Sequence, residues 1–511
     1  MTIVVLASWI ALEKRPPVAT LAWILLVILL PGAGLVLYYF LGYRRVHKSR
    51  LKRLRARLGL KAAKDRLRAG AGPMSLPGAP PELAEVAQFS ASELPAHTIA
   101  AMDAAMNVIR APESRRSLAL VVKTSTDPVR DQQLMTLGTM VSDSPPSTAT
   151  RVDILVDGDE TYAAILEAIA KAEHHIHLEY YIYEPDQIGT RLRDALVERA
   201  KAGVEVLLLV DGVGSRSLSR KFLAPLREAG ARFAWYGQVR LARLRPRMVN
   251  FRTHRKIVVV DGKVGFTGGL NITDTESPAA SGPRAFRDTH QRLEGAVVRW
   301  LDLVFLEDWH HATGHAPTDP KYFPDSTPGD HVVQILSSGP DQPLMAIQKL
   351  YFSAICGAHA RVWITTPYFV PDEAMLAALM TAALRGVDVR LLLPRHNDLR
   401  IVAAAARSYF AELVAVGVRI YEYTPRMLHS KTMVIDDDLA AIGTANMDSR
   451  SFRLNFEVTS VAYDPRVAAA LAKIFEKDLE TSREITQGAL ANEKLPSKIV
   501  SAAARLLSPL L

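Results

Sequence analysis

The feature that most constrains the fold of this chain is a motif that occurs twice. The first copy, HRKIVVVDGKVGFTGGLN, runs from His254 to Asn271, and the second, HSKTMVIDDDLAAIGTAN, runs from His429 to Asn446. Both fit the pattern H-x-K-x4-D-x6-G-x2-N without a gap. One copy could arise by chance, because a His and a Lys two residues apart on a strand simply share a face. Two gapless copies in one chain favour a duplicated domain.

The sequence around the motifs repeats in the same order in each half. The matched segments are 161–172 with 346–357, 176–186 with 362–372, 200–211 with 383–394, and 222–236 with 409–423. Each pair alternates helix-like and strand-like patterns, which predicts βαβ units on mixed, mostly parallel sheets flanked by helices. We therefore predict two similar α/β domains fused face to face. The predicted domains are residues 151–325 and 326–490, and residues 491–511 form a C-terminal tail.

Residues 1–43 have the character of a membrane segment. Val18–Leu41 comprises 24 residues without a charge. A helix of that length spans about 36 Å, which exceeds the roughly 30 Å hydrocarbon core of a bilayer. Trp23 near one end and Tyr43 near the other are typical of the two membrane interfaces. We predict a transmembrane helix at residues 18–41, preceded by a short apolar stretch, residues 1–12, that is too short to cross alone.

A strongly basic run follows this segment directly. Residues Arg44–Arg68 carry twelve Lys or Arg and one acid, a local charge of +11, while the whole chain carries +9. The positive-inside rule then places everything that follows in the cytoplasm, and such a run attracts anionic phospholipids. We assign residues 44–150 to this run and a linker. Because the excess charge lies outside the globular part, a nucleic-acid partner is not expected.

The doubled motif resembles the signature of the phospholipase D superfamily. The resemblance extends over residues 151–485. Other stretches are similar to bacterial cardiolipin synthases: residues 15–42, FRDTH at 286–290, TTPYFVP at 365–371, LNFE at 454–457 and the closing LLSPLL. The resemblance implies an enzyme of the bacterial inner membrane, with its catalytic domains on the cytoplasmic side. It implies transfer of a phosphatidyl group between two phosphatidylglycerol molecules, giving cardiolipin and glycerol. One departure is Gly269, where many superfamily members have Ser.

Two histidines suit the chemistry of a phosphodiester. A neutral imidazole attacks phosphorus and forms a covalent intermediate, so that one difficult step becomes two. A second imidazole protonates the leaving oxygen and then deprotonates the incoming alcohol. The residues alone leave the two roles open; the resemblance implies His254 as the nucleophile and His429 as the acid and base. The side chains expected to hold the phosphate oxygens are Lys256, Lys431, Asn271 and Asn446.

Each catalytic histidine needs an acidic partner at its other ring nitrogen. Asp288 lies 34 residues after His254, and Glu457 lies 28 residues after His429. The resemblance assigns the orienting role to both carboxylates.

The remaining motif residues complete the catalytic candidates. Asp261 and Asp436 follow the motif strands, and this position favours fixing the strand-to-turn backbone over touching substrate. Gly268 and Gly443 are expected to let the backbone approach the phosphate closely.

Neither a metal nor another cofactor is expected. Nucleotide-binding glycine patterns are absent from the sequence, and the single cysteine, Cys356, excludes an internal disulfide. Two histidine clusters lack the carboxylate spacing of a metal site. A helix end that enters a strand is predicted for His174, His175 and His177, and a solvated helix end for His310, His311 and His315.

Three other functions remain open at this stage. A hydrolytic phospholipase D would use the same residues with water as the acceptor, and the motifs do not separate it from a synthase. A nuclease is disfavoured by the near-neutral globular part and the apolar N-terminal segment. A catalytically inactive membrane scaffold is disfavoured because both motifs are intact.

Overall fold

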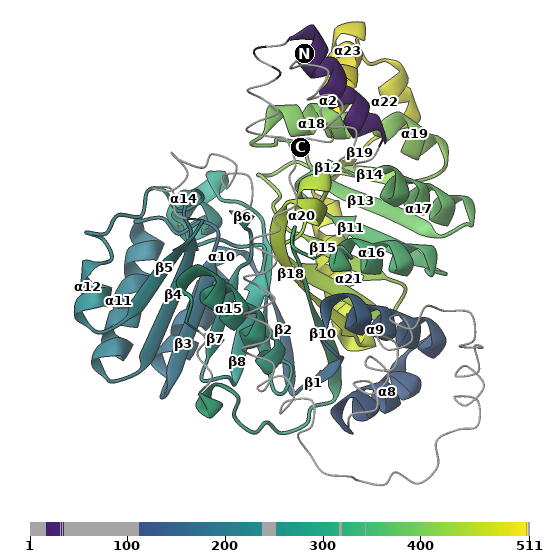
Figure 1. Ribbon diagram of the computed structural model, residues 1–511. Coiled ribbons are helices and arrows are strands. Elements are labelled where there is room, and N and C mark those ends of the chain that lie inside the picture. The colour runs from purple at the N-terminus through teal and green to yellow at the C-terminus, as the bar shows by residue number, and fades with distance from the viewer. Residues whose placement is uncertain are drawn as a thin grey trace.

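The computed structural model describes residues 17–30, 32, 34, 112–237, 252–315, 319–342, 344–506 and 508. Two sheets stand beside each other, and helices cover their remaining faces (Figure 1). The predicted stretch 1–12 and the basic run Arg44–Arg68 lie outside the described residues, as do 35–41 of the predicted transmembrane helix.

The first sheet has seven strands in the order β2-β9-β8-β7-β3-β4-β5. Only β3, β4 and β5 run parallel to one another, and the other pairs are antiparallel. The bounds are β2 (Arg151–Val156), β3 (His175–Tyr180), β4 (Glu205–Asp211), β5 (Arg232–Tyr236), β7 (Ile257–Val260), β8 (Val264–Gly268) and β9 (Thr289–Glu294).

The second sheet repeats this order as β10-β18-β16-β15-β11-β13-β14, and adds β1 and β19 at its two edges. The shared order confirms the predicted α/β duplication. The expectation of mostly parallel sheets was wrong, because the motif hairpins and β9 or β18 pair antiparallel. The bounds are β1 (Ser147–Ala149), β10 (His331–Ser338), β11 (Arg361–Thr365), β13 (Asp388–Pro394), β14 (Arg419–Tyr423), β15 (Thr432–Ile435), β16 (Leu439–Gly443), β18 (Asn455–Tyr463) and β19 (Ser482–Glu484).

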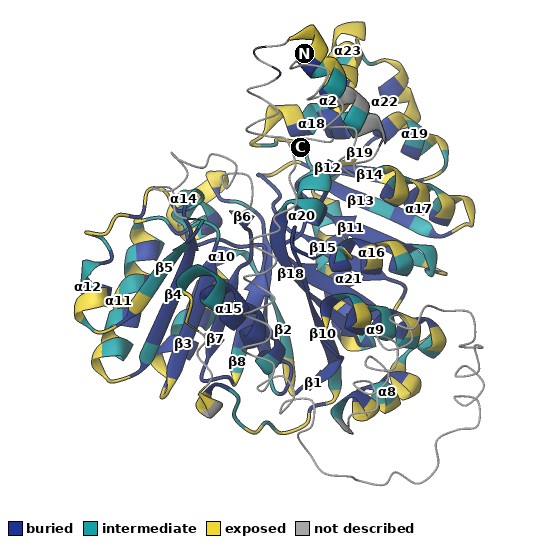
Figure 2. Cartoon of the chain, in the orientation of Figure 1, coloured by how far each residue is buried: buried dark blue, intermediate teal, exposed yellow. Residues whose placement is uncertain are grey.

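Side-chain alternation along the strands sends residues into separate cores. On β4, Leu207 and Leu209 join a central core shared by both halves, whereas Val206 and Leu208 join the outer core of the first half. The central core includes α15 (Val298–Thr313) and α21 (Pro465–Glu480). Figure 2 shows the buried strands running through the middle of the molecule.

The outer helices cover the outer core of each half. In the first half they are α10 (Asp157–Ala170), α11 (Gln187–Lys201) and α12 (Ala224–Glu228). In the second half they are α16 (Ala346–Cys356), α17 (Glu373–Leu384), α18 (Arg400–Arg407) and α19 (Phe410–Ala415). Short elements follow the motifs or close the chain: η3 (Asp274–Glu276), α14 (Pro278–Ser281), α20 (Ser449–Arg453), α22 (Gln487–Ala491) and α23 (Leu495–Leu506).

The end of the segment assigned to the linker folds onto the second half. Helices α8 (Pro112–Thr124) and α9 (Pro128–Ser142) precede β1, which pairs with β10. The buried Arg130 guanidinium contacts Asp131, Asp436 and Asp438. Since Asp436 belongs to the second motif, residues 112–149 support the second half rather than connecting two independent parts.

The N-terminal helix α2 covers Pro17–Leu29. Trp23 and Val27 on this helix are buried, whereas Leu25 and Ile28 are exposed. Within the described part of the chain, none of the helices has both the length and the apolar character needed to cross a membrane.

Candidate active site

The two motifs meet where the halves face each other. His254 lies between the short strand β6 (Arg252–Thr253) and β7, and His429 lies three residues before the start of β15. Strand β6 leaves the first half and pairs with β18 of the second. The N–H of His254 donates to the carbonyl of Phe456 at 2.9 Å, and the N–H of His429 donates to the carbonyl of Arg287 at 2.7 Å. Each motif histidine is therefore held by backbone from the other half.

The acidic partners are exchanged between the halves in the same way. Nδ1 of His254 lies 3.0 Å from Oε2 of Glu457, and Nδ1 of His429 lies 2.7 Å from Oδ2 of Asp288. A carboxylate only accepts a hydrogen bond, so each Nδ1 carries the proton and each Nε2 is left with a lone pair. Both histidines are almost completely buried. The sequence places each acid after the histidine of its own half, but the contact is to the other one.

Burial and charge set the protonation of this group. Burial, together with Lys256, lowers the pKa of His254 to about 4, although Glu457 opposes the shift. Burial and the Lys431 ammonium also lower the pKa of His429. Both imidazoles are consequently neutral at neutral pH, the form in which a histidine can attack phosphorus.

The carboxyl partners are shifted toward the ionised form. Burial alone would raise the pKa of Asp288, but the neighbouring Lys431 and His429 bring it down to about 2. Burial likewise opposes ionisation of Glu457, and His254 and Lys256 still hold its pKa below the usual range. The two orienting acids are therefore anionic across the physiological pH range.

The motif lysines lie beside the histidines, fully buried. Nζ of Lys256 donates to the carbonyl oxygen of His254 at 2.7 Å, and Nζ of Lys431 donates to that of His429. Burial lowers the pKa of Lys256 to about 7 and also lowers that of Lys431. Two buried lysines whose charges repel each other favour an anionic ligand, because a bound phosphate would stabilise their protonated forms.

The motif asparagines lie in matching loops, and these loops introduce a residue that the sequence analysis missed. The backbone N–H of Asn271 donates to Oε1 of Glu276 at 3.2 Å, and that of Asn446 donates to Oγ of Ser451 at 3.1 Å. Glu276 and Ser451 each follow their asparagine by five residues. Aligning the two halves beyond the motif would have found this pair.

Glu276 gives His429 a second acidic neighbour. Its Oε1 lies 3.9 Å from Nδ1 of His429. Burial and the nearby Asp288 carboxylate raise the pKa of Glu276 to about 8. The surroundings of the two histidines are therefore not equivalent, because His254 has one acidic partner and His429 has two.

The motif aspartates contact backbone rather than the histidines. Asp261 accepts hydrogen bonds from the N–H groups of residues 173–175, at 2.7–2.9 Å. Asp436 accepts from residues 359–361 and also contacts Arg130. Both have positive φ, 54° and 49°. These contacts fasten each motif hairpin to the start of β3 or β11.

The glycine that ends the second strand of each motif hairpin makes room for a neighbouring strand. A Cβ at Gly268 would strike His290 of β9, and one at Gly443 would strike Thr459 of β18. These glycines therefore allow close approach of the neighbouring strand, which does not require a phosphate. At Gly269 a Cβ would collide with the Asp288 carboxylate. The corresponding Thr444 instead donates its hydroxyl to Glu457, so Gly269 makes room for Asp288.

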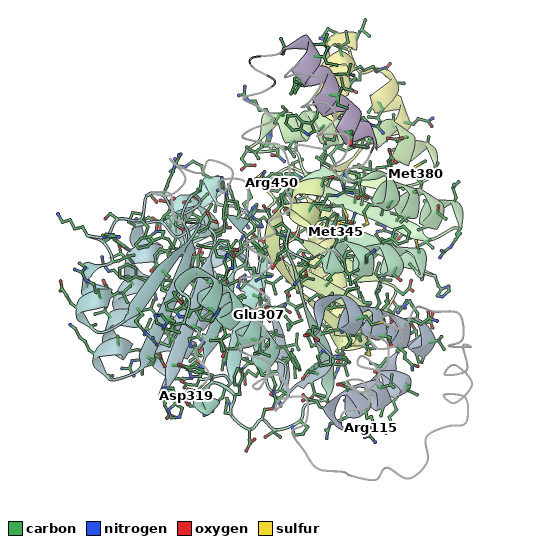
Figure 3. The ribbon with its side chains drawn as sticks, in the orientation of Figure 1. Arg115, Glu307, Asp319, Met345, Met380 and Arg450 are labelled. Atoms are coloured by element: carbon green, nitrogen blue, oxygen red, sulfur yellow. The ribbon has the colours of Figure 1, made fainter. Side chains whose placement is uncertain are left out.

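An aromatic side chain lies beside each catalytic histidine, and two arginines lie near one of these rings. The ring of Tyr181 lies 5.0 Å from that of His254, and the ring of Tyr368 lies 6.5 Å from that of His429. Arg252 and Arg450 are half-buried and lie within electrostatic reach of Tyr181. Figure 3 shows Arg450 on the side of the second half that faces the first.

Two buried groups of the described residues have metal-ligating types close together. Glu276, Asp288 and His429 form one group, but these are candidate catalytic side chains already bonded to one another. His175, His177 and Asp302 form the other, between β3 and α15. Both histidines lie in β3, in agreement with the prediction that their cluster leads from a helix end into a strand.

The sequence of this chain is similar to those of known phospholipid-synthesising enzymes. The family described as cardiolipin synthase, PLD-like domain, matches residues 165–278 and 351–479, and the family described as phospholipase D-nuclease N-terminal matches residues 1–42. The cardiolipin synthase of Alkalihalophilus pseudofirmus is 44% identical over 383 residues, which cover 74% of this chain and 76% of the relative. The chain belongs to the cardiolipin synthase family.

Another relative covers the whole chain. Cardiolipin synthase 1 of Bacillus anthracis is 36% identical over 526 aligned positions, covering 100% of this chain and 92% of the relative. Family membership makes the protein a phosphatidyltransferase of the phospholipase D superfamily, as the sequence analysis predicted. The crystal structure of phosphatidylserine synthase from Haemophilus influenzae has a TM-score of 0.55 at 16% identity, over 74% of this chain and 100% of that one. That likeness concerns the fold alone.

Proposed function

We propose that this chain makes cardiolipin from two phosphatidylglycerol molecules and carries the phosphatidyl group on His254 between the two steps. The observation that supports this most is the exchange of acids, Glu457 to His254 and Asp288 to His429. It joins the two motifs into one composite site with two oriented imidazoles. Transfer through a covalent intermediate needs such a nucleophile and a separate acid.

In the first step, Nε2 of His254 attacks the phosphorus of one phosphatidylglycerol. The bond between phosphorus and the glycerol headgroup oxygen breaks, and His429 gives that oxygen a proton. In the second step, His429 removes a proton from the headgroup hydroxyl of another phosphatidylglycerol. That oxygen attacks phosphorus, the phosphorus–nitrogen bond breaks, and cardiolipin leaves.

The assignment of roles has support from the surroundings of the two histidines as well as from the resemblance. His429 lies near Asp288 and Glu276, whereas His254 has only Glu457. Because burial and Asp288 raise the pKa of Glu276 to about 8, this carboxyl carries a proton at neutral pH, which suits the neighbour of a histidine that moves protons. The bound phosphodiester adds a further negative charge beside both imidazoles. We infer that His429 takes up its proton when substrate is present.

The other motif side chains have supporting roles in this proposal. Lys256 and Lys431 neutralise the phosphate oxygens, and Asn271 and Asn446 donate hydrogen bonds to them. Asp288 and Glu457 orient the histidines. Asp261 and Asp436, which bond to backbone, act on the site through the position of the motif hairpins.

The decisive experiment is a product analysis of the purified full-length chain with phosphatidylglycerol as the only lipid substrate. We expect cardiolipin and free glycerol in equal amounts. Phosphatidic acid as the sole product would instead establish the hydrolytic alternative. Adding phosphatidylethanolamine as a competing acceptor would then measure how strictly the second step selects a glycerol headgroup.

We also propose that the chain works at the inner membrane of a bacterium, with both halves in the cytoplasm. The uncharged run Val18–Leu41 and the basic run Arg44–Arg68 support this orientation. A reporter fused after Leu511 should be active in the cytoplasm. Activity of a periplasm-specific reporter at that position would overturn the orientation.

A further inference from the structure

One end of the second half carries an apolar surface that the reaction does not use. Helices α18 and α23 pack together there, and Arg407 of α18 contacts Glu493 just before α23. Large apolar side chains on or beside these two helices are 43–79% exposed. They are Leu399, Ile401, Leu495, Ile499, Val500 and Leu506, which together we call the apolar rim.

The pattern along α23 is that of an amphipathic helix. Leu495, Ile499 and Leu506 are spaced by four and seven residues, so they share one face, while Ser501 and Ala504 are buried. Lys498 and Arg505 lie on the same helix. Apolar residues flanked by cations are typical of a helix that lies in the headgroup region of an anionic bilayer.

A groove opens between these two helices. Its volume is about 460 Å³, which is within the roughly 300–1,000 Å³ of small-molecule sites. Its walls include Pro367, Phe369, Phe410 and Val500. Arg395 and Arg407 also line it, together with the Glu422 carboxylate that both contact. An apolar groove with two guanidinium groups and one carboxylate suits the acyl and phosphate parts of a phospholipid.

A single loop adjoins both the groove and the active site. Tyr368 lies in sequence between two groove residues, Pro367 and Phe369, and its ring is 6.5 Å from that of His429. Its hydroxyl hydrogen-bonds to Asp398, in the loop after β13, at 2.9 Å. The loops after β11 and β13 therefore connect residues of the groove with a side chain next to His429.

The N-terminal helix lies toward the same end of the molecule. In Figure 1, α2, α18 and α23 are grouped above the second sheet. Leu25, Ile28 and Leu29 of α2 are 50–73% exposed. The apolar side chains that this end presents therefore come from both termini of the chain.

We propose that the apolar rim contacts the phospholipid bilayer directly and that the groove receives a substrate phospholipid from it. This inference rests on the proposed function, since it concerns how a lipid substrate reaches His429. The partner is a bilayer containing anionic phospholipid. The cations of α23 favour such a surface, although Arg505 also contacts Glu412. The loop of Tyr368 adjoins both the groove and His429.

The first test compares two forms of the substrate with the same preparation of full-length protein in vesicles of phosphatidylcholine and anionic phosphatidylserine. Phosphatidylglycerol is supplied either as a long-chain lipid in the bilayer or as a dissolved dihexanoyl lipid. The double variant Ile401→Glu/Ile499→Glu should lose at least about tenfold in rate with the bilayer substrate and less than about twofold with the dissolved one. Leu384→Glu is the matched control, because Leu384 is 70% exposed on α17. It should leave both rates unchanged.

The second test measures contact without relying on activity. A bimane label at Ile499→Cys, in a Cys356→Ala background, should be quenched by brominated lipids in the vesicles, and the same label at Leu384→Cys should not. Absence of quenching at position 499 would overturn the inference, whether the rim is bare or covered by a second copy of the chain. Equal loss of both substrates in the double variant would also overturn it. Failure of the wild-type protein to make cardiolipin from either substrate would refute the proposed function and leave the quenching result standing.

Discussion

Nδ1 of His254 lies 3.0 Å from a carboxylate oxygen of Glu457, a residue 203 positions further along the chain. The equivalent contact from His429 to Asp288 runs back across 141 positions. Neither half therefore contains both a motif histidine and the acid that orients it. The predictions below test what this exchange means for the reaction.

The first prediction concerns both histidines together. His254→Ala and His429→Ala should each lower turnover by at least about a thousandfold, because each removes one of two roles that the other cannot fill. The measurement is cardiolipin formation by purified protein, with circular dichroism showing that each variant is folded. Near wild-type turnover in either variant would contradict a single composite site.

The second prediction separates the two roles. A phosphatidyl ester whose leaving group needs no proton bypasses the need for an acid in the first step. With this donor, His429→Ala should accumulate a phosphatidyl-protein adduct, because breakdown still lacks its base, and His254→Ala should not. Peptide mass spectrometry locates the adduct. An adduct on His429 in the His254→Ala variant would reverse the assigned roles.

The third prediction concerns the acids. Glu457→Gln should slow adduct formation from the activated donor by up to about ten-thousandfold, the loss seen when a catalytic triad loses the carboxylate that orients its histidine. Asp288→Asn should leave adduct formation from this donor nearly unchanged but slow its breakdown. Rapid-quench analysis of the two steps checks the difference. The opposite pattern would mean that each acid serves the histidine of its own half.

The fourth prediction is the pH dependence of adduct formation. His254 reacts in its neutral form, and its pKa is lowered to about 4 by burial and Lys256. Activity should therefore persist below pH 6.5, where an ordinary histidine is half protonated, and fall only as the pH approaches 4. Glu457 raises the pKa of His254, so Glu457→Gln should move the acidic fall in activity to lower pH. A fall in activity near pH 6.5 would show that burial does not lower the pKa of His254.

The fifth prediction concerns the two motif aspartates. Asp261→Ala should lower the free energy of unfolding by about 2–4 kcal/mol, since three backbone N–H groups lose a charged acceptor. Asp436→Ala should cost more, because Arg130 also loses one of its partners. Urea denaturation measures both. A loss of turnover with unchanged stability would instead indicate that these carboxylates touch the substrate.

Much of the fold was accessible from the sequence. Matched segments and the two gapless motifs predict duplicated α/β halves, because strand and helix periodicities are local properties. Strand direction was less accessible. The hairpin β7–β8 returns antiparallel to β3, and βαβ alternation does not encode how such a hairpin joins the sheet.

The site was predictable as a set of residues but not as a set of contacts. His254 and Glu457 meet because β6 pairs with β18, a contact between halves that leaves no mark on local spacing. Glu276 was missed because it lies five residues beyond the motif, where the second half has Ser451 at the equivalent position. Gly269 was only a departure from the usual Ser until the position of Asp288 explained it.

The joining of the two halves in one polypeptide has an evolutionary consequence. An assembly of two identical chains with this exchange of acids would be symmetric, so any substitution would change both histidines' surroundings at once. Here Gly269 of the first half corresponds to Thr444 of the second, and Glu276 corresponds to Ser451. Covalent fusion lets each copy mutate independently. One imidazole can then specialise in bonding to phosphorus while the other specialises in moving protons, a division of labour that a homodimer could not inherit.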